Sequence, residues 1–431
     1  MNRTSLLLLT LGMALGCKGQ EAAPTSPPTP AAATPGVAQD APLAKTPPEA
    51  APDSPPTSPD AAPTGRTRIA VIHTANRVGE INDCGCRAKP LGGIARHKGW
   101  IGQNASQWEA ALLLDAGNTL TASTEIGETF REREQDRAEA IVDAYGLMGL
   151  DAQGVAEKDL AIGLDRLREL AKRAKFPFLS ANLLDAGGQP VFPGHTVITK
   201  AGHRIGVVSV LSPHFLDAER LTAAWGVRVS DPTEAVRREV ETLRKDGVRI
   251  IVALAMLPLT DAEALARAVP ELTAILGTSD MREQTYPVTV GHTYVCDSWE
   301  KGKRFSVLTL HVAPGDEELV FTDPGRRAAL QQQVADLDTR IAEREKAIEA
   351  ATQDPGAARN LDWLKQNVAK LKAERQTLTL DLADLGEVDA SRSNISYDFP
   401  EVTQDLPADG PVDARLDALR AKYPELKGPG E

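Results

Sequence analysis

The chain carries the segments Ile72-His73-Thr74-Ala75-Asn76, Asp83-Cys84-Gly85-Cys86-Arg87 and Pro90-Leu91-Gly92-Gly93-Ile94-Ala95-Arg96, and the first of them begins at the end of an apolar run. That run, residues 69–72, has the continuous apolar character of a strand buried on both faces. The glycines of the third segment allow a helix to begin close against the preceding loop. The three segments therefore predict a strand, a loop with two cysteines and a helix.

The pattern repeats downstream. Buried strands are predicted at residues 69–72, 111–114, 205–211 and 250–254, and helices with three-and-four apolar spacing at residues 138–147, 164–174, 233–244 and 261–269. This alternation predicts an α/β fold. The chain has 431 residues, which suits one large domain with appendages, because single cores stop growing near roughly 250–300 residues.

With these three segments, the chain resembles the 5′-nucleotidase/metallophosphatase superfamily, and within it the UshA-like seleno/cysteine proteins. Members of that branch carry Cys-Gly-Cys or Cys-Gly-selenocysteine before a Gly-Gly-x-Ala-Arg run. The resemblance covers about residues 68–314. It implies a four-layer αββα sandwich, with two sheets back to back and helices outside, and a site in the loops at the strand ends.

The resemblance also implies a two-metal site, whose ligand positions and catalytic histidine, here Lys158, can be followed through five motifs. These positions hold Asn76, Val78, Asn118, Glu157, Lys158, Met256 and the run Gly277-Thr278-Ser279-Asp280. Hard cations need carboxylate or imidazole ligands, and every expected histidine is replaced. Val78 and Met256 cannot bind such ions, and Lys158 adds positive charge. We expect conventional phosphate hydrolysis to be lost.

Two ways of filling the vacated site follow from these residues. In the first, Lys158 forms an ion pair with Glu157 or with Asp280. In the second, Glu157, Asp159 and Asp280 hold one weakly bound divalent cation. No cofactor is otherwise indicated.

The cysteines carry the leading functional hypothesis. Cys84 and Cys86 are close enough in sequence to form a strained disulfide, and Arg87 beside them would favour the thiolate. They act either as a redox or ligand-capturing pair or as a structural loop staple. We expect Cys296 to lie near them as a third thiol, because its strand should end at the same cavity; the alternative is a small buried apolar residue.

The N-terminus has the features of a bacterial lipoprotein. Residues 1–16 form the expected signal peptide, and Cys17 follows small residues and is the expected lipidation site. Residues 17–66 should be a disordered tether, since residues 21–65 hold 13 of the 30 prolines. We expect a lipid-anchored protein of the cell envelope, on the outer membrane facing the periplasm. The net charge of -12 argues against nucleic acid as a partner.

The composition changes after residues 67–314, the expected metallophosphatase-like domain. Leucine, isoleucine and valine recur at heptad spacing on both sides of Pro355-Gly356. This predicts an inserted antiparallel helical hairpin, a coiled coil within residues 315–388. Residues 389–431 then predict a strand and a short helix that return to the domain.

Three functions remain open at this stage. The first is an envelope lipoprotein with a degenerate site and a thiol role through Cys84 and Cys86, with a redox partner protein. The second is a divergent metal-dependent phosphoesterase. The third is a non-catalytic scaffold that works through the helical hairpin.

Overall fold

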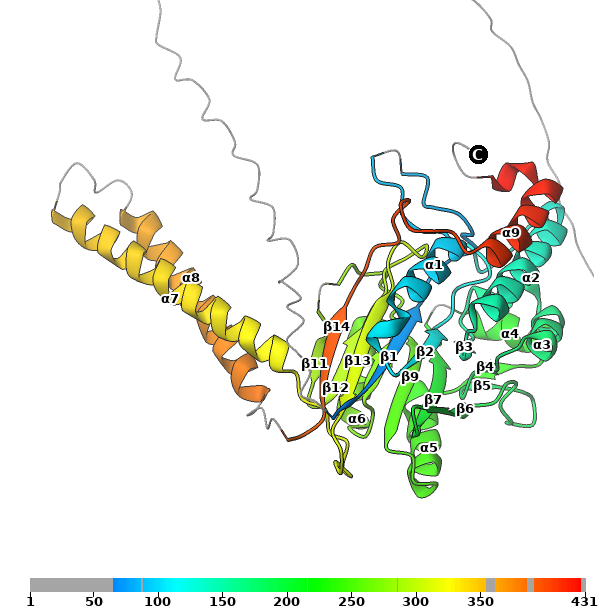
Figure 1. Ribbon diagram of the computed structural model, residues 1–431, viewed down its shortest axis with the longest axis horizontal. Helices are drawn as coiled ribbons and strands as arrows, with labels where there is room; N and C mark the ends of the chain where they lie inside the picture. The colour runs from blue at the N-terminus through cyan, green and yellow to red at the C-terminus, as the bar shows by residue number, and fades with distance from the viewer. Residues whose placement is uncertain are drawn as a thin grey trace, which may run out of the picture. The chain divides into compact units, whose positions relative to one another are not determined.

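The computed structural model describes residues 65–86, 88–214, 216–284, 286–353, 361–385 and 391–427. Its centre is a pair of six-stranded sheets (Figure 1). The first sheet has the order β14(Asn394–Asp398), β13(Ser306–Val312), β1(Thr67–Thr74), β2(Ala110–Asp115), β3(Ala152–Gly154) and β4(Phe178–Leu179). The second has the order β11(Val288–Val290), β12(Thr293–Cys296), β10(Ala274–Leu276), β9(Ile250–Met256), β7(His203–Leu211) and β6(His195–Lys200).

Both sheets are parallel at the centre and antiparallel at the margins. β1, β2, β3 and β4 pair in parallel, and β13 and β14 add antiparallel strands at one side. β7, β9, β10 and β12 are likewise parallel, between antiparallel β6 and β11. A small third sheet joins β5(Leu183–Leu184) to β8(Arg228–Val229).

Strand alternation builds the layers. Ile69 and Val71 of β1 face the core between the two sheets, together with Val207 of β7, whereas Ile72 packs under helices on the other side. Because both faces are covered, these strands are continuous apolar runs. The predicted strands at residues 69–72, 111–114, 205–211 and 250–254 all lie within observed strands.

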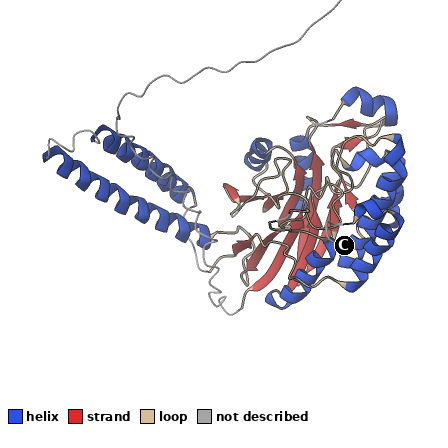
Figure 2. Cartoon of the chain, turned by 90° about the horizontal axis from the view of Figure 1, so that it is seen from above, coloured by secondary structure: helices blue, strands red, loops and turns tan. Residues whose placement is uncertain are grey.

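Helices cover both outer faces (Figure 2). The outer face of the first sheet packs against α1(Ile94–Asn104), α2(Arg131–Met148), α3(Leu164–Arg173), α4(Ala218–Trp225) and α9(Gly410–Lys422). The outer face of the second packs against α5(Pro232–Lys245) and α6(Leu259–Ala268). Short 3₁₀ segments are η1(Ala105–Gln107), η2(Glu128–Phe130), η3(Asp159–Ile162) and η5(Pro424–Leu426). The fold is therefore the four-layer αββα arrangement.

Two long helices, α7(Pro324–Gln353) and α8(Leu361–Asp384), follow β13. They share a small apolar cluster around Leu337 and Leu371. Ion pairs join Asp338 to Arg375 and Glu345 to Lys372. The residue of α7 in the second pair has a higher number than in the first, whereas the residue of α8 has a lower one. The two helices therefore run antiparallel.

The segment after α8 differs slightly from its prediction. The strand that we predict within residues 389–431, over residues 394–402, is shorter in the structure, because β14 ends at Asp398. β14 pairs with β13, and α9 buries Val412, Leu416 and Leu419 against the first sheet's helices. Among the described helices, none has the length and apolar character that a membrane span requires.

Candidate functional site

The candidate site lies where the central strands end. Asn76 follows β1, Asn118 follows β2, Glu157 follows β3 and Thr278 follows β10. Backbone hydrogen bonds tie the first two loops together, from the N–H of Asn76 to Gly117 O at 2.9 Å and from the N–H of Val78 to Asn118 O at 2.9 Å. The carboxyl ends of parallel strands are the usual place for a binding site in α/β proteins.

A chain of side-chain amides connects these loops. Asn76 Nδ2 donates to Thr278 O at 2.7 Å, and Asn118 Nδ2 donates to Asn76 Oδ1 at 3.3 Å and to Glu157 Oε1 at 2.7 Å. Asn118 Oδ1 accepts from the backbone N–H of Lys158 at 3.0 Å. Asn76, Asn118 and Glu157 are all buried. The structure therefore brings together three of the residues predicted from the motifs.

The loop backbone is left-handed at three of these positions. Asn76 has φ 51°, Val78 φ 50° and Asn118 φ 55°. Asparagine tolerates this region, but for a β-branched valine it is a strained conformation. Such strain is usually found where the surrounding structure serves a site. The loops thus keep a backbone conformation that is unfavourable for a residue such as Val78.

Asp159 holds the loops in place. Oδ2 accepts from the N–H groups of Asn118 and Ala156 at 2.9 and 3.0 Å, and Oδ1 accepts from those of Thr119 and Leu120 at 2.8 Å each. The side chain is fully buried, and burial raises the pKa of Asp159 to about 7 although these N–H groups lower it. Both oxygens are used by the backbone.

The residues do not fit a pair of hard metal ions. Glu157 and Asp159 are the buried carboxylates among the predicted positions, and Asp159 is already occupied. Burial raises the pKa of Glu157 despite the hydrogen bond from Asn118. Within the described ranges, no group of three or more His, Cys, Asp or Glu side chains is placed to hold a metal. The predicted single-cation set of Glu157, Asp159 and Asp280 does not converge.

The predicted ion pair of Lys158 is also absent from the described part of the chain. Lys158 is half-buried and has no carboxylate within ion-pair distance, whereas Asp280 is exposed and accepts from the N–H of Leu259 at 3.4 Å. The amide chain of Asn76 and Asn118 satisfies the site instead. Asn76 and Asn118 add no charge of their own, so their hydrogen bonds avoid the desolvation cost of a buried ion pair.

Small apolar groups fill the floor of the site. Gly277 has φ 85°, and a Cβ added there would lie 2.6 Å from the Cβ of Ala116, 3.3 Å from that of Ala75 and 3.4 Å from the sulfur of Met256. Met256 itself is fully buried. The position where the resemblance expects a histidine ligand is therefore part of the apolar core.

Sequence reasoning missed a buried polar network beside the site. Asp115 Oδ2 accepts from Thr74 Oγ1 at 2.7 Å and from the hydroxyl of Tyr145 at 2.9 Å, and that hydroxyl accepts from Arg77 Nε at 2.8 Å. All four side chains are buried, and burial raises the pKa of Asp115. The signal was a charged residue near the end of each of two apolar runs, with Asp115 directly after residues 111–114 and Arg77 five positions after Ile72.

A second missed carboxylate follows β12. Asp297 is buried, accepts from the hydroxyl of Thr278 and from the N–H of Arg282 at 3.1 Å, and burial raises its pKa to about 6. It therefore orders the loop that carries Thr278 and Asp280.

Cys84 and Cys86 are free thiols on the surface. They belong to residues 82–92, which we call the thiol loop. The N–H of Cys84 donates to Leu91 O at 2.7 Å, and an antiparallel bridge joins Asp83 to Gly92, closing the loop at its base. Cys84 is half-buried and Cys86 is exposed.

The two thiols have different environments. Cys86 Sγ lies 3.9 Å from Cys84 O. Partial burial raises the pKa of Cys84, but hydrogen bonds from Cys86 and Leu91 and the charge of Lys303 outweigh it and lower this pKa. The hydrogen bond to Cys84 raises the pKa of Cys86. Cys84 is therefore the readier nucleophile.

For Cys296 the structure favours the second of the two alternatives, a small buried apolar residue. Its side chain is completely buried in the core between the two sheets, among residues such as Leu276 and Tyr294. Burial raises the pKa of Cys296 far above its usual range. A thiol in this position behaves as a small apolar residue. The predicted Arg87 and Cys17 lie outside the described residues.

Curated relatives align with part of the chain, and no family model matches it. A 2′,3′-cyclic-nucleotide 2′-phosphodiesterase/3′-nucleotidase from Salmonella typhimurium is 24% identical over 175 residues, which are 38% of this chain and 27% of that protein. The uncharacterized metallophosphoesterase YunD from Bacillus subtilis is 27% identical over 179 residues, 40% of this chain and 36% of YunD. The chain thus spans about a third of the length of these relatives.

Solved structures share the fold over most of the chain. The 5′-nucleotidase precursor from Thermus thermophilus superposes with a TM-score of 0.54 at 18% identity, covering 83% of this chain and 59% of that one. The calcineurin-like phosphoesterase YfkN from Bacillus subtilis gives 0.56 at 13% identity, covering 84% and 98%.

Fold and relatives thus make this chain similar to the 5′-nucleotidase/calcineurin-like metallophosphoesterase superfamily. This chain is similar to nucleotide phosphoesterases of that superfamily, with amides, apolar groups and a lysine at the expected ligand positions.

Proposed function

We propose that this protein uses a phosphoesterase fold without two-metal hydrolysis and acts through Cys84 and Cys86 in thiol–disulfide exchange. The observation that carries the proposal is the pair itself. Cys84, which is half-buried, and Cys86, which is exposed, are free thiols on a closed loop, and Cys86 Sγ lies 3.9 Å from Cys84 O. The pKa of Cys84 is lowered and that of Cys86 is raised. Such a low-pKa, accessible thiol beside a second one is the arrangement of a redox dithiol.

The chemistry needs a partner protein with a disulfide. The thiolate of Cys84 attacks one partner sulfur, a mixed disulfide forms, and the other partner sulfur leaves as a thiolate. The thiolate of Cys86 then attacks the Cys84 sulfur and displaces the second partner thiolate. Two electrons pass to the partner, and the protons lost by Cys84 and Cys86 end on its two thiols. The reverse sequence oxidises a partner dithiol.

A series of glutathione redox buffers tests this proposal. The purified protein is equilibrated in each buffer, quenched with acid, alkylated, and the oxidation of each cysteine is quantified by mass spectrometry. We expect Cys84 and Cys86 to convert together with one two-electron midpoint. Cys296→Ser is the matched control and should keep that midpoint, because Cys296 lies in the core.

Two results would overturn the proposal. One is a pair that stays oxidised across the whole series, which identifies a permanent loop staple. The other is a pair that never forms the disulfide, even in the most oxidising buffer. With a small disulfide-bonded substrate protein, Cys84→Ser should abolish its reduction, and Cys86→Ser should stop the reaction at a mixed disulfide with Cys84.

The alternative is a divergent metal-dependent phosphoesterase. The names of the relatives favour it, as does Glu157, whose Oε2 is buried and has no hydrogen-bond partner among the described residues. One carboxylate oxygen with neighbouring amides is a poor ligand set for the two cations that such hydrolysis uses. We therefore rank this function second.

We further propose that the protein is lipid-anchored in the cell envelope through Cys17. The support is the sequence alone, because Cys17 lies outside the described residues. Cys17→Ser should move the protein from the membrane to the soluble fraction in cell fractionation. Retention of that variant in the membrane would contradict a lipid anchor.

A further inference from the structure

The C-terminal residues 399–427, which we call the C-terminal clamp, hold the thiol loop from its upstream side. Arg420 of α9 donates twice to Asn82 Oδ1, from Nε at 3.0 Å and from Nη2 at 2.7 Å. Asn82 Nδ2 donates in turn to Leu426 O at 2.6 Å. Asn82 and Arg420 are both buried. The clamp therefore holds the residue two positions before Cys84.

The clamp also holds the other flanks of the thiol loop. Gln404 Nε2 donates to Asp83 Oδ2 at 3.0 Å, and Asp83 Oδ1 accepts from the N–H of Gly85 at 2.9 Å. On the downstream side, the N–H of Gly92 donates to Val402 O at 2.7 Å. Lys89 and Glu401 form an ion pair at 2.6 Å. Both ends of the segment that carries the thiols are therefore fastened to the clamp.

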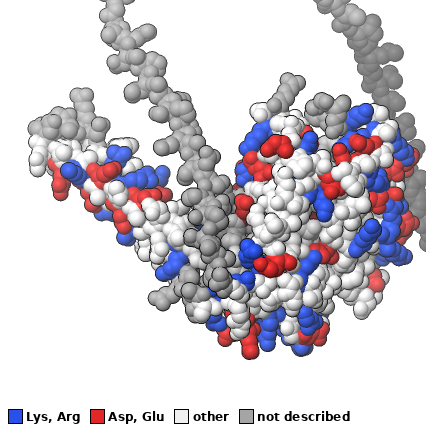
Figure 3. Space-filling model, viewed as in Figure 1, with Lys and Arg blue, Asp and Glu red and all other residues white. Residues whose placement is uncertain are grey.

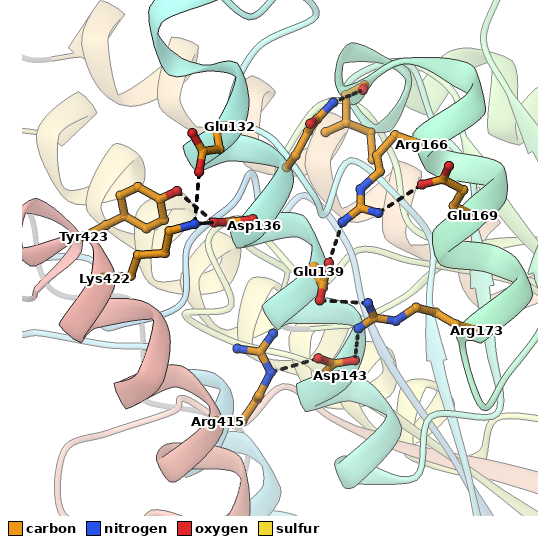
Figure 4. A network of polar contacts seen from close by, with 12 residues as sticks. Glu132, Asp136, Glu139, Asp143, Arg166, Glu169, Arg173, Arg415, Lys422 and Tyr423 are labelled. Carbon is orange, nitrogen blue, oxygen red and sulfur yellow. Dashed lines mark hydrogen bonds and ion pairs between the residues drawn. The ribbon is translucent and has the colours of Figure 1, made fainter.

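A ladder of carboxylates on α2 fastens α9 itself (Figure 4). Lys422 Nζ lies 3.1 Å from Glu132 and 2.5 Å from Asp136, which also accepts from the hydroxyl of Tyr423 at 2.7 Å. Further along, Arg415 of α9 donates to Asp143 at 2.8 Å. Asp143 and Glu139 each bind Arg173 of α3, at 2.6 and 2.7 Å. The ladder joins α9, α2 and α3.

We propose that Arg420 is a positioning residue for the thiol pair: through Asn82, the docked helix α9 sets the geometry of the thiol loop and thereby the difference in reactivity between Cys84 and Cys86. This inference rests on the proposed thiol function, and it adds that the docked helix α9 governs the reactivity of the two thiols. Arg420 is suited to the role because its guanidinium group presents several donors in a rigid plane. It contacts Asp413 and Asp417 at 3.2 and 2.7 Å while it binds Asn82.

Loss of this contact has a defined consequence for the loop. Without Arg420, the buried oxygen of Asn82 loses its two charge-assisted hydrogen bonds, and the loop gains freedom at its upstream end. The contact between Cys86 and Cys84 depends on the fixed loop, so the two thiols should become more alike.

The test measures the iodoacetamide alkylation rate of each thiol as a function of pH in the full protein. In the unmodified protein, Cys84 should react at lower pH than Cys86. In Arg420→Gln, the two profiles should converge, and the ratio of the two rates near neutral pH should fall at least about threefold. Arg415→Gln is the matched control, since Arg415 lies on the same helix and contacts Asp143 rather than the thiol loop.

Three further variants make the test specific. Arg420→Lys should restore part of the difference, because an ammonium group can donate one of the two bonds. Asn82→Ala should give the same converged alkylation profiles as Arg420→Gln. If Arg420→Gln fails to fold, Asn82→Ala takes its place in the test. The double variant should show no further change.

The outcomes separate this inference from the function on which it rests. Unchanged alkylation profiles in both Arg420→Gln and Asn82→Ala would overturn the positioning role, as would an equal change in Arg415→Gln. Alkylation does not require exchange with a disulfide. An unmodified protein that fails in the glutathione series therefore counts against the proposed function and leaves this coupling intact.

Discussion

In the candidate site, hydrogen bonds hold the loops together in place of metal ions. They are made by Asn76, Asn118 and Asp159. Two cations bound by ligands from several loops would hold those loops together. Here Asp159 accepts four backbone N–H bonds, and the two asparagines connect the loops to Thr278 and Glu157. A buried N–H group without an acceptor costs folding free energy. We therefore expect Asp159 to contribute mainly to the stability of the fold.

Asp159→Ala should destabilise the protein by about 3 kcal/mol or more, since several buried N–H groups lose their acceptor at once and each costs roughly 1–3 kcal/mol. Urea unfolding followed by circular dichroism measures the change. Asp165→Ala is the matched control, because the Asp165 side chain is 97% exposed, and surface ion pairs contribute about 1 kcal/mol or less. Equal losses of unfolding free energy in the two variants would contradict the role of Asp159 in holding the loops together.

His97 provides a second prediction at this scale. It is buried on α1 and stacks on Phe305 with ring centroids 4.1 Å apart, and neither ring nitrogen has a hydrogen-bond partner among the described residues. Burial, and secondarily the charge of Arg77, lowers the pKa of His97 well below 6.5. The neutral ring is thus favoured in the folded state.

The sign of the pH effect follows from this lowered pKa. The unfolded chain binds a proton at His97 below about pH 6.5, whereas the folded chain does not, so stability falls with decreasing pH by up to about 1.4 kcal/mol per unit. His97→Phe should remove this contribution and leave stability at neutral pH equal or higher. Urea midpoints across the acidic range measure it. The exposed control His292→Phe should keep the original slope. A second buried histidine, His73, also has a lowered pKa, of about 3, because of burial, so His97→Phe should reduce the slope rather than abolish it; an undiminished slope in that variant would refute the assignment.

At the scale of elements, α7 and α8 form an insertion with adjacent ends. The N–H of Thr322 donates to Ser393 O at 3.2 Å, and the N–H of Ile395 donates to Thr322 O at 2.9 Å. The chain therefore leaves β13 and returns to β14 at nearly the same point. The apolar cluster of the two helices, around Leu337 and Leu371, is separate from the clusters of the sheets. The two helices can therefore bury their apolar faces against each other.

Deletion of residues 326–390, joined by a short glycine linker, should leave the sandwich folded. Far-ultraviolet circular dichroism should show a loss of helix, while chemical unfolding should remain one cooperative transition. The alkylation profiles of Cys84 and Cys86 should not change, because the C-terminal clamp starts after the deleted segment. An aggregated product, or altered thiol profiles, would show that the two helices support the rest of the domain.

At the scale of the whole molecule, the chain combines a phosphoesterase fold with an acidic, mixed surface. The face in Figure 3 intersperses acidic and basic side chains. The site lacks the ligand chemistry of two-metal hydrolysis, because Val78, Met256 and Thr278 stand at expected ligand positions. These features together predict that the fold is retained for a different use.

Hydrolysis of nucleotides and of an aryl phosphate should therefore remain at background with added manganese or zinc. Colorimetric release of phosphate or of the aryl alcohol measures it. The control is Bacillus subtilis YfkN, a calcineurin-like phosphoesterase with the same fold, assayed in the same buffers. Turnover that survives repurification and disappears in Glu157→Gln would establish the divergent phosphoesterase instead.

The sequence by itself determined the framework. Continuous apolar runs such as residues 250–254 identified buried parallel strands, and three-and-four spacing identified the helices between them, because both signals are local. The resemblance also predicted which positions would carry metal ligands, and Asn76, Asn118, Glu157 and Thr278 among them follow the ends of strands. The left-handed asparagines and Glu157 were thus located before their contacts were known.

Only the tertiary structure decided how the site is filled. An ion pair of Lys158 was one of the two expected fillings, but side-chain amides connect Asn76, Asn118 and Glu157 instead. Cys296 was expected beside the thiols, but strand alternation turns its side chain into the core. The contact of Asn82 with Arg420 joins positions 338 residues apart. No local pattern encodes such a contact, because it arises only when the last helix packs against the first sheet's helices.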